Sequence, residues 1–170
     1  MKNAGFLIFS DIHGNFNDAY KVLSRQIKAP DAVLFLGDGA RDVSLLRSNF
    51  SHVAFVGVRG NCDFVGADDL PDERLEELCG LRVLMLHGHT RGAKSGLGSI
   101  IKAALEADAD AVLFGHTHTP VEICYLPEEL CAISDRDRPL WLFNPGAMRN
   151  GEFGTLSVRD GVPLFSHGNI

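Results

Sequence analysis

The chain has 170 residues, 45% of them hydrophobic and 22% charged, with a formal net charge of −6. This length and composition predict a single domain, residues 1–170, and exclude a disordered chain. The acidic balance without a Lys/Arg-rich run excludes a general binder of long nucleic acid. The N-terminal apolar run, residues 5–9, is too short for a signal peptide or a membrane span, so we expect a cytoplasmic protein that contacts no membrane.

Apolar runs alternate with amphipathic stretches in the first two thirds of the chain. Buried strands are predicted at the apolar runs, residues 5–9, 32–36, 53–58, 83–86 and 111–114. Helices are predicted between them, at residues 15–28, 41–48 and 99–107. Such alternation favours a parallel α/β sheet.

Strands without intervening helices follow in the last third of the chain. They are predicted at residues 121–125 and 140–143, and as a hairpin at residues 155–158 and 162–165. An earlier segment, residues 72–78, is expected to pair with residues 82–86. The Pro- and charge-rich residues 127–139 are expected to form a surface excursion between two strands. These strands indicate a second sheet.

Polar residues able to bind metals follow the strands predicted for the first sheet. In chain order they are Asp11, His13, Asp38, Asn61, His87, His89, His116 and His118. Because the loops beyond the carboxyl ends of parallel strands meet in one crevice, we expect these side chains to converge. Histidines clustered at the ends of apolar strands need partners, since buried polar groups without them cost free energy.

The set combines imidazole, carboxylate and carboxamide donors. Such mixed nitrogen and oxygen ligands suit Mn, Fe, Co, Ni or Zn ions. Without His89, seven ligands remain, more than the four of a closed zinc site, so two ions joined by a bridging Asp are the economical arrangement. Two ions about 3.5–4 Å apart activate a shared water and clamp phosphate oxygens. The pattern therefore predicts metal-assisted hydrolysis of a phosphate ester.

Five motifs resemble, in order and spacing, those of the calcineurin-like metallophosphoesterases. They are SDIHGN at 10–15, GDG at 37–39, GNCD at 60–63, HGH at 87–89 and GHTHTP at 115–120. With a late NPG at 144–146, the chain is most similar to the small single-domain phosphodiesterase branch of bacteria and archaea. The resemblance covers nearly the whole chain and implies an α/β fold, a four-layer α-β-β-α sandwich of two mixed sheets flanked by helices.

The resemblance also implies how the residues divide between two ions. One ion would be bound by Asp11, His13, Asp38 and His118. The other would be bound by Asp38, Asn61, His87 and His116, so that Asp38 bridges the two. We expect Mn, with Ni, Co, Fe or Zn as alternatives. The implied activity is hydrolysis of phosphate esters, diesters rather than monoesters, by a metal-activated water.

The proton donor for the leaving group is left open. Many relatives carry a His directly after Gly-Asn that is thought to protonate the leaving group, whereas Cys62 stands at that place here. Cys62 and His89 are the candidate donors, with His89 preferred, and a good leaving group would need neither.

Three further residues are candidates for a supporting role. Asn15 either caps the following helix or touches the phosphate, and capping is the favoured interpretation. Asp63 either orients a metal ligand or only forms a turn. Arg91, like Lys94, is a candidate contact of the substrate phosphate. His167, near the C-terminus, is assigned no role.

Two competing functions stay open. A non-catalytic interaction scaffold is one, because a eukaryotic coat-complex subunit that resembles this fold serves mainly as a scaffold. It predicts eroded metal ligands, whereas all the implied positions are filled here. A single-metal hydrolase is the other, and one bound ion per chain would indicate it. The expected partner is a small phosphate-ester substrate, and a homo-oligomer is left open.

Overall fold

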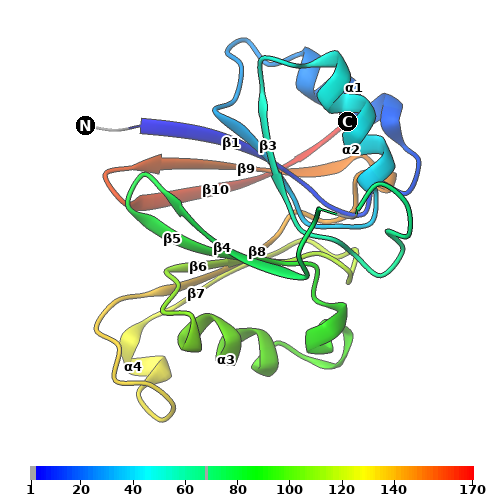
Figure 1. Ribbon diagram of the computed structural model, residues 1–170. Coiled ribbons are helices and arrows are strands. Elements are labelled where there is room, and N and C mark those ends of the chain that lie inside the picture. The colour runs from blue at the N-terminus through cyan, green and yellow to red at the C-terminus, as the bar shows by residue number, and fades with distance from the viewer. Residues whose placement is uncertain (1–2, 68) are drawn as a thin grey trace.

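Two five-stranded sheets pack face to face, with helices on their outer faces (Figure 1). The computed structural model describes residues 3–67 and 69–170. Helices α1, Phe16–Ser24, and α2, Ala40–Asn49, cover the first sheet, whereas α3, Gly98–Glu106, and α4, Pro127–Leu130, lie on the side of the second. The predicted four-layer α/β sandwich is confirmed.

The first sheet has the strand order β10-β9-β1-β2-β3. Its strands are β1, Asn3–Phe9; β2, Ala32–Phe35; β3, Ala54–Gly57; β9, Glu152–Arg159; and β10, Val162–Asn169. The strands β1, β2 and β3 are parallel, and β9 joins the other side of β1 antiparallel. All four residues of β2 are buried, as expected for a strand covered on both faces.

The second sheet has the strand order β4-β5-β6-β8-β7. Its strands are β4, Glu73–Leu78; β5, Leu81–Leu86; β6, Ala111–Leu113; β7, Val121–Tyr125; and β8, Leu140–Asn144. The central strands β5, β6 and β8 are parallel, and both edge strands are antiparallel. The predicted pairing of β4 with β5 is confirmed, and its two turn residues, Cys79 and Gly80, both have positive φ, as in a type I′ turn.

The predicted division of strands between the two sheets is wrong in part. Strand β6 was expected beside the first three strands but lies in the second sheet with β5, and the late hairpin β9–β10, expected in the second sheet, joins the first. An apolar run shows that a strand is buried without showing which strand lies beside it. Strand β1 is buried toward its end, and it pairs with β2 on one edge and with β9 on the other.

Helix α1 ends earlier than the predicted residue 28. Its buried face consists of Ala19, Val22 and Leu23, whereas Ile27, the next residue at helical spacing, is fully exposed. The residue before Pro30 is biased away from helical conformation, which favours an early end. The expected excursion at residues 127–139 contains the short helix α4.

The main core lies between the two sheets. Its buried side chains include Ile8 and Leu34 from the first sheet and Met85, Leu113 and Phe143 from the second. Among the described residues, no helix has both the length and the apolarity needed to cross a bilayer. The fully buried strands hold the loops at their carboxyl ends in fixed positions, and those loops carry the polar residues considered next.

Candidate metal centre

The structure gathers residues from the loops after β1, β2, β5 and β6 at one end of the sandwich. Six of the seven expected metal ligands are joined by short distances between their side chains. They are Asp11, His13, Asp38, His87, His116 and His118. The seventh, Asn61, is exposed, and its amide Nδ2 donates to Cys62 Sγ at 3.1 Å. The expected convergence of these loops is thus present.

Asp11 is buried and its two carboxylate oxygens have different surroundings. Oδ2 accepts hydrogen bonds from the Ser10 hydroxyl at 2.6 Å and from the backbone N–H of His116 at 3.0 Å. Oδ1 has no hydrogen-bond partner and lies 3.0 Å from Nε2 of His118. One oxygen is therefore held by the protein, while the other faces the cluster with its lone pairs free.

Asp38 is arranged in the same way. Its Oδ1 accepts the backbone N–H of Cys62 at 2.7 Å. Its Oδ2 lies 3.7 Å from Nε2 of His13 and 3.4 Å from Nε2 of His87. Burial alone would raise the pKa of this carboxyl, but the adjacent His87 ring and the Cys62 N–H outweigh burial and hold the pKa well below its usual range. Asp38 is thus an anion between two imidazoles.

His87 is fully buried, and a hydrogen bond fixes the tautomer of its ring. Nδ1 lies 2.7 Å from the carbonyl oxygen of Leu36, so Nδ1 carries the hydrogen and donates it. Nε2 then points at Asp38 and Asp11 without a hydrogen-bond partner. A backbone carbonyl on the second ring nitrogen is the usual support of a metal-binding histidine.

The imidazoles form two pairs around Asp38. The ring centroids of His13 and His118 are 5.3 Å apart, and those of His87 and His116 are 5.0 Å apart. One member of each pair lies within 3.7 Å of the same Asp38 oxygen. These pairs match the two ligand groups that the family resemblance implies, although the coordination itself stays a prediction.

A divalent ion fits the donors that the chain presents. Asp11 Oδ1 and His87 Nε2 are buried polar atoms without hydrogen-bond partners, and such atoms cost free energy unless something compensates them. The structure contains three sets of residues in which the donor atoms of each set lie within 4.8 Å of one another. The sets are Asp11, His13 and His118; Asp11, Asp38 and His87; and His13, Asp38 and Cys62. Mixed nitrogen and carboxylate donors at this spacing suit Mn, Fe, Co, Ni or Zn.

The backbone around the cluster is strained. Five of the expected ligands have positive φ, a conformation uncommon outside glycine. They are Asp11 at 52°, His13 at 45°, Asp38 at 60°, His116 at 67° and His118 at 58°. Each such residue costs on the order of 1–3 kcal/mol and persists where the surrounding structure fixes it, which is typical of functional sites.

Two glycines are required by close packing against the ligands. A Cβ at Gly60 would overlap Oδ1 of Asp38. A Cβ at Gly115 would overlap the Ser10 hydroxyl and lie 2.9 Å from Oδ2 of Asp11. Only a residue without a side chain leaves these carboxylates where they are.

Asp63 holds the loop that carries Asp38. Its carboxylate accepts four backbone N–H groups, from Asp38, Gly39, Ala40 and Gly60, each at 2.8 Å. Helix α2 begins at Ala40 behind Gly39, which has no side chain to cap the helix, so Asp63 supplies the cap from a distant loop. Of the two interpretations of Asp63, the geometry favours orientation of a metal ligand over a simple turn.

Asn15 does not cap helix α1 through its side chain, so the capping interpretation is wrong. Its amide instead donates to the Asp18 carboxylate at 2.9 Å and to the Met148 carbonyl at 3.1 Å. The amide nitrogen cannot accept a helix N–H, and these acceptors orient it away from that task. Asn15 therefore ties α1 to the turn Met148–Asn150.

The guanidinium of Arg91 is paired with a carboxylate. It donates to both carboxylate oxygens of Glu73, at 2.6 and 2.8 Å. Lys94 lies near the cluster, since its positive charge is among the causes, after burial and the charge of His87, that lower the pKa of His116. Contact of either residue with a substrate phosphate stays a prediction.

The two candidate proton donors lie beside different members of the cluster, Cys62 beside Asp38 and His89 beside two of the histidines. The His89 ring is 5.4 Å from that of His87 and 6.2 Å from that of His116, and its Nδ1 is buried without a partner. Burial, followed by the charge of His87, lowers the pKa of His89. Burial and the neighbouring Asp38 raise the pKa of the Cys62 thiol, which therefore keeps its hydrogen at neutral pH.

Two residues that support the centre were missed from the sequence. Buried Asn144 donates to the Gly115 carbonyl at 3.0 Å and to the Thr117 hydroxyl at 3.1 Å, and so fixes the loop that carries His116. His167 donates from Nε2 to the Asn144 carbonyl at 2.8 Å. The sequence indicates no role for His167, because a contact with a residue far away in the chain leaves no local pattern.

A rise in pH should lower the stability of the metal-free protein and raise the stability of the metal-loaded protein. Burial opposes a charged His87, but Asp38 and Asp11 outweigh it and raise the pKa of His87. The stability that this group contributes is complete below the unfolded pKa of about 6.5 and is lost as the pH rises through the raised value. Metal binding needs an unprotonated Nε2, so its contribution grows over the same interval.

The test is the melting temperature between about pH 6.5 and pH 8.5, with chelator and with Mn²⁺. We expect it to fall with pH in chelator and to rise with pH in Mn²⁺. The lowered pKa values of His89 and His116 act below this interval and do not disturb it. Slopes of the same sign in both buffers would contradict the assignment of His87.

Comparison with known proteins places these features among phosphoesterases. The profile of the Calcineurin-like phosphoesterase superfamily domain matches residues 5–159. The "Probable metallophosphoesterase YsnB" of Bacillus subtilis (strain 168) is 31% identical over 146 residues, which cover 84% of this chain and 74% of that protein.

Solved structures share the fold at lower identity. A conserved uncharacterized protein of Streptococcus pneumoniae TIGR4, described as a predicted phosphoesterase, is 22% identical, with a TM-score of 0.76 over 99% of this chain and 91% of its own. Vacuolar Protein Sorting 29 from Cryptosporidium parvum is 14% identical, with a TM-score of 0.70 over 99% and 98%. Vps29 from Entamoeba histolytica, solved with Zn²⁺, is 16% identical, with a TM-score of 0.61 over 97% and 98%.

Proposed function

Because the chain belongs to the calcineurin-like phosphoesterase superfamily, we propose that it hydrolyses phosphodiesters, in preference to monoesters, at a centre of two divalent ions. The observation that carries the proposal is the pair of buried, unpartnered donor atoms, Asp11 Oδ1 and His87 Nε2, that face a common space. The preference for diesters rests on the resemblance to the small single-domain phosphodiesterase branch.

Members of this family depend on divalent metals, and we assign the ligands here as two sets that share Asp38. Asp11, His13 and His118 complete the first set, and Asn61, His87 and His116 complete the second. Mn²⁺ is the proposed ion, and Ni, Co, Fe or Zn fit the same donors. When bound, two such ions supply a water of lowered pKa and neutralise charge on the phosphate.

The chain's own contribution is to hold these ligands in fixed orientations. Ser10 fixes one oxygen of Asp11, and the Cys62 N–H fixes one oxygen of Asp38. The Leu36 carbonyl fixes the tautomer of His87. A site held this way before the substrate arrives needs little reorganisation during the reaction.

We propose His89 as the group that protonates the departing oxygen, with Cys62 as the alternative. A proton donor matters most for a leaving group of high pKa, because an alkoxide is a poor leaving group without protonation. We therefore expect His89→Gln to slow hydrolysis of an alkyl diester by about 10²-fold and to change hydrolysis of bis-p-nitrophenyl phosphate much less.

Rates for both substrates with His89→Gln and Cys62→Ser are the measurement. The alternative holds if Cys62→Ser shows the dependence on the leaving group and His89→Gln does not. Equal slowing of both substrates by His89→Gln would mean that His89 positions other groups and donates no proton.

The proposed activity is tested with protein stripped by a chelator and reloaded with Mn, Ni, Co, Zn or Mg. Bis-p-nitrophenyl phosphate and p-nitrophenyl phosphate serve as the diester and monoester probes. We expect turnover only after reloading, with the diester hydrolysed faster. No metal-dependent turnover of either ester with any ion would overturn the proposal.

An interaction scaffold on the same fold is the competing candidate. It predicts a tight stoichiometric partner for a chain that takes up no metal. Elemental analysis of the reloaded protein separates the candidates, because two bound ions per chain favour the hydrolase, whereas one ion would indicate a single-metal enzyme.

A further inference from the structure

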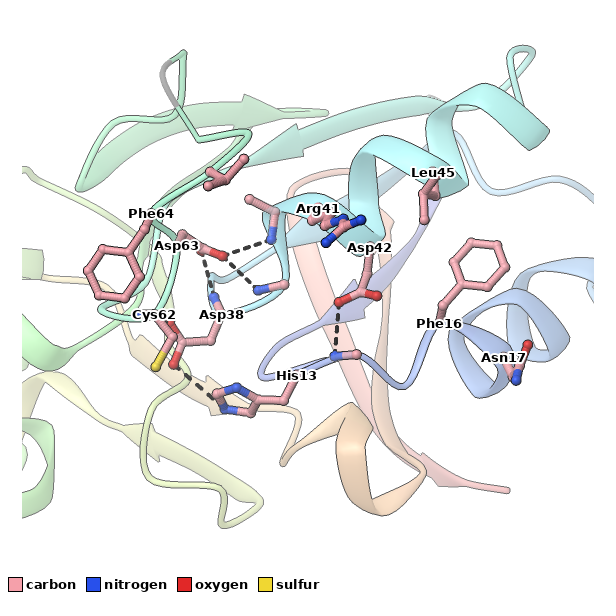
Figure 2. A pocket seen from close by; sticks show the side chains of 14 residues that line it. His13, Phe16, Asn17, Asp38, Arg41, Asp42, Leu45, Cys62, Asp63 and Phe64 are labelled. Atoms are coloured by element: carbon pink, nitrogen blue, oxygen red, sulfur yellow. Dashed lines mark hydrogen bonds and ion pairs between the residues drawn. The ribbon is translucent and has the colours of Figure 1, made fainter.

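A pocket of about 760 Å³ opens beside the candidate metal centre (Figure 2). It shares His13, Asp38 and Cys62 with that centre and extends toward the starts of α1 and α2. Sites for small organic ligands have volumes of about 300–1,000 Å³. The pocket therefore has room for a sizeable organic group attached to a phosphate at the metal ligands.

Large apolar side chains stand on opposite sides of this pocket. Phe64 and Val65, from the loop after Cys62, are 86% and 74% exposed. Phe16 and Leu45 lie on the facing wall, on α1 and α2 (Figure 2). An aromatic ring exposed to this degree beside a reaction centre is suited to stack against a planar group of a ligand.

Arg41 gives the pocket its positive charge. It is the sole Lys or Arg among the lining residues, and within the described part of the chain it makes no hydrogen bond or ion pair. By contrast, Arg59 and Arg91 are each paired with a carboxylate. Arg41 is thus available to a ligand.

The carboxylates of the same pocket are already engaged. Asp63 accepts its four backbone N–H groups, and Asp42 accepts the N–H of Gly14 at 3.0 Å. Asp38 belongs to the metal ligands. These carboxylates keep their negative charge, but their oxygens are directed at backbone N–H groups, and the unpaired side chain that the pocket offers to a phosphate is the Arg41 guanidinium, which is well shaped to bind it.

We propose that this pocket selects nucleotide esters that carry a second phosphate. The scissile phosphate lies at the metal centre, the base stacks on Phe64, and the second phosphate pairs with Arg41. This inference rests on the proposed function, since it assumes that one phosphate occupies the metal ligands. The residues that select the substrate, Arg41 and Phe64, lie outside the set assigned to the metal.

Calorimetric titration of Mn²⁺-loaded protein tests the proposal through binding alone. The probes are inorganic phosphate, ribose 5-phosphate, thymidine 5′-monophosphate and thymidine 3′,5′-bisphosphate. We expect the monophosphate to bind about tenfold more tightly than ribose 5-phosphate, because it adds a stacked base. We expect the bisphosphate to gain about a further tenfold from the guanidinium.

Each variant should remove one step of this series. Arg41→Gln should abolish the advantage of the bisphosphate over the monophosphate, and Phe64→Ala should abolish the advantage of the monophosphate over ribose 5-phosphate. The matched controls are Arg47→Gln, an exposed arginine on the same helix outside the pocket, and Ile133→Ala, an exposed apolar residue on the far side. Both controls should keep the full series.

The proposal is overturned if all the probes bind equally to the wild type, or if Arg41→Gln weakens all of them to the same extent. Turnover of bis-p-nitrophenyl phosphate shows whether the pocket assignment alone is wrong or the proposed metal centre is wrong as well. Metal-dependent turnover with equal affinities contradicts the pocket assignment alone. If inorganic phosphate does not bind and no ester is hydrolysed, the metal centre and the pocket assignment fail together.

Discussion

Replacing Asp38 by Asn should remove both metal ions and lower kcat by at least about 10³-fold, more than the 10–100-fold typical of residues that only support a ligand. Asp38 Oδ2 lies between one member of each histidine pair, at 3.7 Å from His13 and 3.4 Å from His87. An amide at this place carries no charge, so it would not offset the positive charge of two ions. Elemental analysis and the rate on bis-p-nitrophenyl phosphate are the measurements.

Two comparisons separate a bridging ligand from a terminal one. His118→Gln should cost one ion, because His118 adjoins Asp11 and His13 alone among the ligands. Asp42→Asn, on the first turn of α2, should keep both ions, because Asp42 accepts only the Gly14 N–H. Asp38→Asn that retains one ion per chain would show that Asp38 is terminal.

The elements of the fold were predictable where burial leaves a periodic pattern, and their neighbours were not. The all-apolar residues of Ala32–Phe35 predict a buried strand. The short turn at Cys79 and Gly80 predicts that the two strands it joins are paired. By contrast, nothing near Asn3–Phe9 identifies Glu152–Arg159 as its antiparallel partner. Pairing between distant strands depends on packing of the complete chain, which local pattern does not contain.

The gathering of the polar residues within each sheet was predictable, because parallel strands deliver their following loops to the same end of a sheet, whereas the meeting of two sheets at that end was not. The hydrogen bonds that hold these polar residues in place could not be predicted. Ser10 and Asp63 bind the ligand loops through hydrogen bonds to groups that have no sequence signature. The left-handed φ of Asp11 and His118 has no sequence signature either, because most Asp and His residues have negative φ.

The same principle explains the partners of the supporting residues that the sequence did not indicate. Asn15 follows a turn and precedes a helix, so capping was the natural expectation, yet the Met148 carbonyl competes successfully for its amide. Arg91 stands between two glycines after a ligand motif, yet Glu73 on the neighbouring strand engages its guanidinium. Polar side chains bind whichever partner the tertiary fold brings within reach, so their roles become visible only in the structure.

Removing the Asp63 carboxylate should have the second-largest effect, on stability and metal affinity together. Asp63→Ala leaves four backbone N–H groups around Asp38, Gly39, Ala40 and Gly60 without their acceptor. Hydrogen bonds to a charged acceptor contribute more than neutral ones, and orphaned donors cost free energy. We expect a loss of about 2–3 kcal/mol in the free energy of unfolding and a 10–100-fold weaker affinity for Mn²⁺, about the cost of losing a group that orients a metal ligand.

Denaturant unfolding of the metal-free protein measures the first effect, and titration with Mn²⁺ well below the melting temperature measures the second. Asp42→Ala is the matched control, because it removes a carboxylate from the same region that accepts one N–H instead of four. It should cost about 1 kcal/mol and leave Mn²⁺ affinity unchanged. If Asp63→Ala loses stability but binds Mn²⁺ as the wild type does, Asp63 caps α2 without positioning Asp38. Since the same carboxylate bonds the N–H groups of both Asp38 and Ala40, we expect the two losses to occur together.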